Sequence, residues 1–164
     1  MLERVLTALE VSVLGLWAGA MAGFAFVFAP VAIKIVPRMD TFATLIASVV
    51  RALGPFGAVC GGIAIAAACL RGLAPSGRPL AIARIALVAI GLAASAYEVS
   101  SAIPRMEATA ATIAGPIDSV DKSDPRRAAY DAEHQASSRV YGTAFLCVLG
   151  ALGLAAFGRK SLKG

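Results

Sequence analysis

The sequence predicts an all-α integral membrane protein, a four-transmembrane-helix bundle. Of its 164 residues, 59% are hydrophobic and only 15% are charged, whereas a soluble domain is about half apolar and about a quarter charged. The apolar residues form four long runs, without the alternation that the strands of a membrane β-barrel show. A soluble fold of this length cannot hide so much apolar surface from water, so we expect the excess to face lipid.

The four runs predict four spans, and the whole chain, residues 1–164, is expected to be one membrane domain. Each run reaches or nearly reaches the ~20 residues that cross a bilayer. The first continues well past the apolar core of a signal peptide, which has about 7–15 residues. We expect spans at about residues 7–33, 48–70, 80–102 and 139–157, with a polar connection over residues 104–133.

Helices are expected to extend beyond the membrane, on the side of the connections between spans 1 and 2 and between spans 3 and 4. Ser123 and Asp124 form an N-cap signal, Pro125 takes the favoured first helical position, and no breaker follows until Gly142. We therefore predict one helix over residues 125–157, longer than the membrane requires.

Small residues recur every four positions within the spans, which allows helix backbones to approach closely in lipid. The repeats are Gly15, Gly19 and Gly23; Gly57 and Gly61; Gly91 and Ser95; and Ser138 and Gly142. We interpret each repeat as packing inside the bundle. The alternative for the first repeat is a homo-oligomer in which two copies of the chain meet through these glycines.

Basic residues divide evenly between the two faces of the membrane. The face of the termini has Arg4, Arg71, Arg78, Arg84, Arg159, Lys160 and Lys163, and the other has Lys34, Arg38, Arg105, Lys122, Arg126, Arg127 and Arg139, with Arg51 nearby. Orientation follows Lys and Arg in short flanking segments, and the first set lies in the shorter segments. We therefore expect both termini in the cytoplasm, with the protein in a bacterial inner membrane.

Charged residues inside the spans predict a ligand site. Glu98, Arg51 and Arg139 each lie roughly 18–19 residues along their helices from the termini face, about 27–29 Å at 1.5 Å per residue. His134 lies a little over one turn beyond Arg139. Charges within a membrane are costly and usually face a cavity or a partner. We therefore expect these side chains to meet in a polar layer inside the bundle, near one interface.

Three functions are compatible with such a layer. In the first, the protein binds or passes a small polar solute or ion, the two guanidinium groups being suited to a carboxylate or a phosphate. In the second, it is a membrane-embedded enzyme in which Glu98 and His134 hold a metal, or in which two copies of His134 hold a haem. In the third, it is a structural or accessory module, with Arg51 or Arg139 pairing Glu98 to join helices. The sequence identifies no cofactor.

The other residues that could carry chemistry are assigned to packing or to contact with the lipid surface. No nucleotide loop, hydrolase elbow, zinc motif or c-type haem site occurs, and Cys60, Cys69 and Cys147 have no metal-ligand spacing. The basic residues lack interleaved aromatics, so the positive charge indicates lipid headgroups and no nucleic acid. Nearer the termini face, Glu10 and Arg84 are expected to form a structural ion pair.

Short motifs lie along nearly the whole chain: Trp17-Ala-Gly19, Phe26-Val-Phe28-Ala-Pro30, Tyr97-Glu98 followed by Ile103-Pro104-Arg105-Met106, and His134-Gln-Ala-Ser137-Ser138. Together they resemble the transmembrane-protein-205-like family, small four-helix membrane proteins of bacteria and eukaryotes. That family has no well-established activity to transfer. The resemblance draws attention to Pro104, Arg105, His134 and Ser138, which border the polar layer. Some relatives have an amide where this chain has Glu98, which argues against an acid–base role common to the family.

Overall fold

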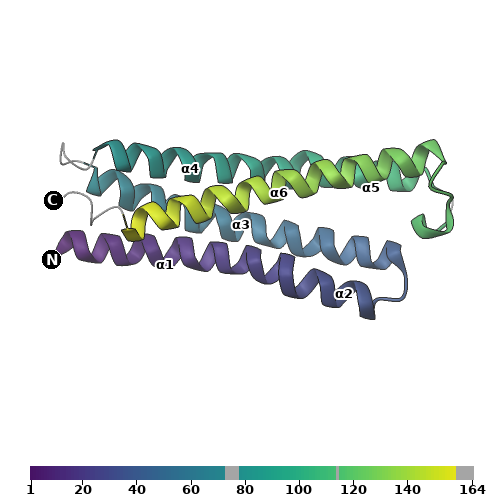
Figure 1. Cartoon of the computed structure of the whole chain (residues 1–164), viewed down its shortest axis with the longest axis horizontal. Coiled ribbons are helices and arrows are strands. Elements are labelled where there is room, and N and C mark those ends of the chain that lie inside the picture. Colours follow the sequence, from purple (N-terminus) through teal and green to yellow (C-terminus); the bar gives the residue numbers. More distant parts are fainter. Residues whose placement is uncertain (73–77, 114, 158–164) are drawn as a thin grey trace.

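The computed structural model describes residues 1–72, 78–113 and 115–157, and within these ranges it is helical with no strand. Four helical spans run side by side along the long axis of the molecule (Figure 1). Each is long and apolar enough to cross a membrane: Leu2–Ile35, Met39–Arg71, Arg78–Ala111 and Pro125–Phe157. The predicted bundle of four membrane helices is confirmed.

Two of the spans contain a π-helical stretch. The first span is α1 (Leu2–Ala22), η1 (Gly23–Phe28) and α2 (Ala29–Ile35), and the third is α4 (Arg78–Tyr97), η3 (Glu98–Ala102) and α5 (Ile103–Ala111). Each π stretch ends two residues before a proline, Pro30 or Pro104. Proline has no N–H, and its ring meets the carbonyl of residue i−4. The wider π turn lets the span continue past the proline.

The second and fourth spans are single helices, α3 (Met39–Arg71) and α6 (Pro125–Phe157). The predicted helix over residues 125–157 is therefore confirmed. So is its N-cap, because Asp124 Oδ1 accepts the backbone N–H of Arg126 at 2.8 Å. A 3₁₀ turn, η4 (Ile117–Ser119), lies in the connection between α5 and α6.

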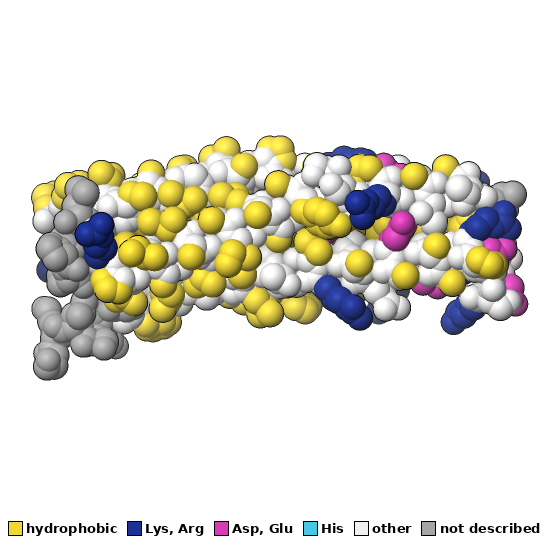
Figure 2. Space-filling model, turned by 90° about the horizontal axis from the view of Figure 1, so that it is seen from above, with side chains coloured by type: hydrophobic (Ala, Val, Ile, Leu, Met, Phe, Trp, Pro, Cys, Tyr) yellow, Lys and Arg dark blue, Asp and Glu magenta, His cyan; other side chains and the backbone are white. Residues whose placement is uncertain are grey.

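The two ends of the bundle differ in character. We call the end where α1 and α4 begin and α3 and α6 end the termini end. The opposite end, which holds the connections from α2 to α3 and from α5 to α6, is the collar end (Figure 1). Apolar side chains cover most of the visible surface from the termini end to beyond the middle, whereas most charged side chains on this face lie toward the collar end (Figure 2). The helices thus extend beyond the apolar section on the predicted side.

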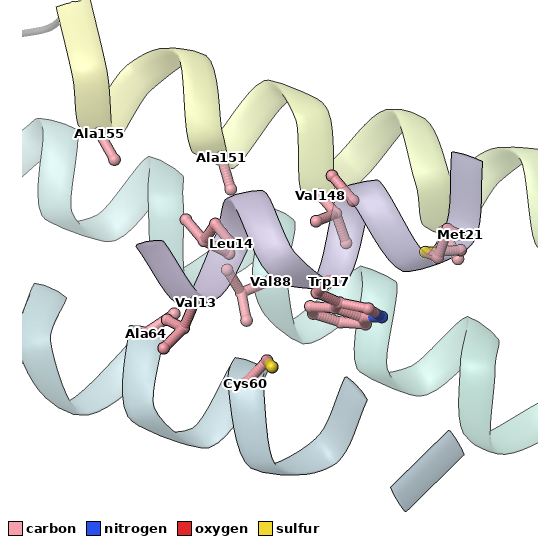
Figure 3. Packing of buried hydrophobic residues seen from close by; sticks show 12 residues of the cluster. Val13, Leu14, Trp17, Met21, Cys60, Ala64, Val88, Val148, Ala151 and Ala155 are labelled. Atoms are coloured by element: carbon pink, nitrogen blue, oxygen red, sulfur yellow. The ribbon is translucent and has the colours of Figure 1, made fainter. Parts of the chain in front are cut away.

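An apolar core fills the space between the spans in the section nearer the termini end. Leu14 and Val148 have no exposed surface, and Trp17 is 1% exposed. Their side chains converge with that of Val88 between the helices (Figure 3). Only 22–33% of the most apolar window of each span is buried inside the bundle, so most of the apolar surface remains for lipid.

Glycines on α3 make room for this core. A Cβ at Gly57 would come within 2.6 Å of Trp17 Nε1, and one at Gly61 within 2.8 Å of Leu92 Cδ2. Gly91 of α4 lies similarly close to Val148. For these repeats the interpretation as packing inside the bundle is confirmed.

The repeat on the first span faces the other way. A Cβ at Gly15, Gly19 or Gly23 would meet nothing within 4 Å. The prediction that this repeat packs inside the bundle is therefore wrong. The face that α1 buries carries its large residues, Leu14 and Trp17 among them, because close packing in a core favours side chains that fill volume. The repeat of Ser138 and Gly142 on α6 also lies on an outward face, since Ser138 is exposed and Gly142 has no such neighbour.

Candidate functional site

Glu98 is buried inside the bundle at the point where α4 gives way to a π turn. It is the first residue of η3 and is 4% exposed. The Ser137 hydroxyl of α6 donates a hydrogen bond to Glu98 Oε1. The second carboxyl oxygen, Oε2, is buried and has no hydrogen-bond partner. The carboxyl group is thus only half satisfied by the protein.

A small cavity lies beside this carboxyl. Its volume is about 20 Å³, enough for one water molecule. All four spans line it, with Trp17 and Met21 from α1, Gly54 from α3, Glu98 from η3 and Tyr141 from α6. The Tyr141 hydroxyl donates to the Met21 carbonyl oxygen at 3.0 Å, so its proton is engaged by the backbone. The cavity is therefore a mostly apolar chamber with the Glu98 carboxyl in its wall.

The arginines predicted to meet Glu98 lie elsewhere. Arg51 Nη2 contacts Glu107 Oε2 of α5 at 2.6 Å, with both side chains more than 40% exposed. Arg105 and Arg139 are also exposed. The expectation that Glu98 and the arginines meet in an enclosed layer is therefore wrong. Near a membrane interface a long arginine side chain can reach surface partners and headgroups, at much lower cost than burial.

The face of α6 that points into the bundle is offset by one residue from the predicted face. Its buried residues are Ser137, Ala144, Val148, Ala151 and Ala155. His134 and Ser138 are exposed instead, and the His134 ring stacks on the Tyr130 ring with centroids 6.5 Å apart. The residue that sequence reasoning missed is Ser137. The signal was the run of small and apolar residues at helical spacing in the second half of α6, which extends back to Ser137.

The described residues do not assemble a metal site. Nowhere in residues 1–72, 78–113 and 115–157 do three His, Cys, Asp or Glu side chains gather closely enough to hold an ion. His134 was paired with Glu98 as a candidate ligand, but it is exposed whereas Glu98 is buried. The two side chains do not share one chamber.

A second charged cluster lies inside the termini end. Glu10 of α1 is 1% exposed and lies between two arginines. Arg84 Nε of α4, the expected partner, is 2.8 Å from Glu10 Oε1, and Arg71 of α3 donates to Glu10 Oε2. The arginine side chains are 5% and 9% exposed. We call these three residues the triad. Arg71 had been assigned only to the positive membrane face, because its distance in sequence from Glu10 gave no sign of contact.

Comparison with known protein families gives a match over much of the chain. The model of a family described as Domain of unknown function (DUF4149) matches residues 12–113, more than half of the 164 residues. This stretch includes Glu98 and both arginines of the triad, and it ends before Ser137. No curated protein and no solved structure matches the chain.

Proposed function

We propose that this bundle, which belongs to the family described as Domain of unknown function (DUF4149), binds a small cation at the Glu98 carboxyl. The proton is included among these cations. The observation that carries the proposal is Glu98 Oε2, which is buried beside a cavity with no hydrogen-bond partner. Ionisable side chains within a membrane commonly mark ion or ligand sites. π turns within α-helices are also frequent at functional sites.

The charge of the Glu98 carboxylate favours a cation over an anion as the ligand. Across the described residues no ion pair reaches Glu98, and its partner is the neutral Ser137 hydroxyl. A buried carboxylate without a counter-charge is costly by several kcal/mol. A proton on the carboxyl, or a cation beside Oε2, removes that cost. An anionic solute would add a like charge, so we replace the carboxylate or phosphate expected from sequence with a cation.

Binding is better supported than passage across the membrane. Glu98 lies fourteen positions after Arg84 along the third span, about 21 Å. Leu14, Val88 and Val148, each no more than 2% exposed, pack between these two levels. Passage would require this apolar section to open, or several copies to enclose a wider path. The outward repeat of Gly15, Gly19 and Gly23 offers a surface for such a homo-oligomer.

A structural role is the second candidate. The Glu98–Ser137 hydrogen bond joins the third span to the fourth, and the triad joins α1, α3 and α4. On this account Glu98 only holds helices together. The metal-dependent form of the enzyme alternative required Glu98 and His134 to act together, and the exposed His134 does not support it. The form in which two copies of His134 hold a haem stays a proposal. The finer likeness to the transmembrane-protein-205-like family remains a proposal and adds no activity.

Labelling with dicyclohexylcarbodiimide tests cation binding. This apolar reagent takes up the proton of a carboxylic acid while the carboxylate oxygen adds to its central carbon, and acyl transfer to nitrogen then leaves a stable N-acylurea. We expect purified full-length chain to be labelled at Glu98, with a rate that falls as pH rises or as Na⁺ or K⁺ is added. Mass spectrometry of peptides locates the label.

Matched variants make the result specific. Glu98→Gln should abolish the label, whereas Glu107→Gln, at an exposed carboxylate, should leave Glu98 labelling unchanged. The structural account predicts a labelling rate that neither Na⁺ nor K⁺ alters. Equal labelling of Glu98 and Glu107 at every pH and salt concentration would reject the proposal.

A further inference from the structure

The triad carries an excess positive charge in a buried place. Two guanidinium groups share the single carboxylate of Glu10, and all three side chains are at least nine-tenths buried. Arg84 Nε lies close to the carboxylate but makes no aligned hydrogen bond. An arginine has five N–H donors, so one carboxylate cannot engage both guanidinium groups fully.

The ion pairs of the described residues give both arginines of the triad the same acidic partner. In the described part of the chain, Glu10 is the acidic partner of both Arg71 and Arg84. The two longer segments outside it, residues 73–77 and 158–164, contain no Asp or Glu in their sequence. Because an uncompensated buried charge is strongly destabilising, two arginines that share one carboxylate are suited to binding a further anion.

The depth of the triad places it within reach of lipid headgroups. Arg51, exposed with Arg105 and Arg139, marks the collar-side edge of the apolar section. Arg71 is twenty residues farther along α3, about 30 Å, which is the thickness of the hydrocarbon core. Arg71 is also the last residue of α3. Its guanidinium group therefore lies near the opposite interface, with Glu10 and Arg84 slightly deeper.

The distribution of charge along the whole chain points to the same end. By position in the sequence, seven basic and two acidic residues belong to the termini end, and eight of each belong to the collar end. The formal net charge of +5 thus belongs entirely to the termini end. Such a surface attracts an anionic leaflet, which raises the local concentration of phosphate groups around the triad.

We propose that Arg71 and Arg84, held by Glu10, bind a phosphate group at the termini-side interface, supplied by an anionic phospholipid or by phosphate in solution. Guanidinium groups match phosphate oxygens in geometry and charge. Glu10 holds both arginines, which come from different helices, and the buried Arg84 Nε has no hydrogen-bond partner. This site is independent of Glu98 and lies at the other end of the bundle.

The experiment uses the full-length chain in uncharged detergent, titrated with phosphatidylglycerol and, separately, with phosphatidylcholine. Native mass spectrometry measures the lipid retained. We expect the wild-type chain to retain phosphatidylglycerol in preference to phosphatidylcholine. Arg71→Gln should weaken phosphatidylglycerol binding about tenfold or more, the loss expected for one charge-assisted hydrogen-bonded pair. Arg78→Gln, at an exposed arginine of the same end, should leave it unchanged.

Two further arms complete the test. Competition by inorganic phosphate assigns the site to the phosphate group alone, whereas no competition assigns it to the lipid headgroup. Glu10→Gln keeps both arginines and should retain or strengthen binding, which keeps the test decisive if Arg71→Gln does not fold. Equal affinity of wild type, Arg71→Gln and Arg78→Gln for phosphatidylglycerol, or loss of binding in Glu10→Gln, would overturn the proposal.

Discussion

The two buried glutamates of this bundle are satisfied in different ways. Both oxygens of the Glu10 carboxylate have an arginine beside them. At Glu98 the Ser137 hydroxyl engages one oxygen and the other has no partner. A carboxylate between two cations needs nothing more from outside, whereas one beside a single hydroxyl needs a proton or a cation. The same residue type therefore serves packing at one end and is available for binding at the other.

Ser137→Ala tests the contact that holds Glu98. The substitution removes the donor to Oε1 and leaves both carboxyl oxygens without a protein partner. We expect the free energy of unfolding in detergent to fall by about 1–3 kcal/mol, the cost of a buried polar group that loses its hydrogen bond. Ser138→Ala is the matched control, because the exposed Ser138 hydroxyl donates only to the His134 carbonyl of its own helix. Equal stability of the two variants would contradict this description of the site.

The depth of Glu98 could be predicted from sequence, but its partners could not. Counting residues along a helix gives height at 1.5 Å per residue, and Glu98 does share a cavity with Val50 and Tyr141, which are close in sequence to Arg51 and Arg139. The direction in which each side chain points turns by about 100° per residue, so an error of one residue in the inward face of α6 exchanged Ser138 for Ser137. Arg51 pairs with the exposed Glu107 instead of Glu98. Such a pair depends on the tertiary fold and leaves no pattern in the local sequence.

At the scale of the helices, Trp17 determines how closely α1 approaches its neighbours. The indole fills the space beside Gly57 and close to Gly91. Glycine is needed at position 57 because any Cβ there would overlap the ring. The four-residue repeats predicted close packing correctly on α3 and α4. On α1 the same repeat faces outward, since a small-residue pattern is equally suited to packing within one bundle and between two.

Gly57→Ala is therefore expected to destabilise the bundle. The added methyl group would lie 2.6 Å from Trp17 Nε1, and overpacking of this kind costs about 1–3 kcal/mol. Gly62→Ala on the same helix meets no atom within 4 Å and should be neutral or stabilising by up to about 1 kcal/mol. Thermal unfolding of both variants in detergent checks the difference. A neutral Gly57→Ala would mean that Trp17 is not packed against α3.

The stability of the first turn of α6 depends on pH through its N-cap, Asp124. The Arg126 side chain and backbone N–H hydrogen-bond Asp124 and lower the pKa of its carboxyl group from 3.8 to about 2. Because the folded pKa is depressed, the stabilising contribution is fully present above about pH 4 and is lost as pH falls through about 2. We expect the Arg126 amide resonance to titrate with a midpoint near 2 and to be constant in Asp124→Asn. A wild-type midpoint near 4 would show that the cap is not formed.

Across the whole molecule, two charged sites are separated by a buried apolar section. The triad lies inside the termini end and the Glu98 cavity lies toward the collar end. Between them lies the apolar core that includes Leu14, Val88 and Val148 (Figure 3). The composition of the chain was enough to predict four membrane spans, because each must be apolar over its full crossing. The separation of Glu10 and Arg84 from Glu98 was predictable from their positions along the spans, whereas the further partners of each site were not, since they depend on which charges the folded bundle buries.

The basic residues of the termini end lie in the shorter flanking segments, and this predicts the orientation. Positively charged flanks remain on the cytoplasmic side, so we expect both termini in the cytoplasm. Fusion of green fluorescent protein to the C-terminus should give fluorescent bacterial cells, and fusion of alkaline phosphatase should give inactive enzyme. Active phosphatase with no fluorescence would place the termini on the opposite side.

The central claim is that the Glu98 carboxyl binds a cation inside the bundle, and carboxyl-carbon NMR tests it most directly. In a chain labelled with ¹³C at glutamate side-chain carboxyls, the Glu98→Gln and Glu107→Gln variants assign the two resonances. The account predicts that the Glu98 resonance moves on titration with H⁺, Na⁺ or K⁺ independently of the exposed Glu107 resonance. If the two move together with pH and neither cation affects Glu98 alone, the carboxyl group is open to water and the proposed site does not exist.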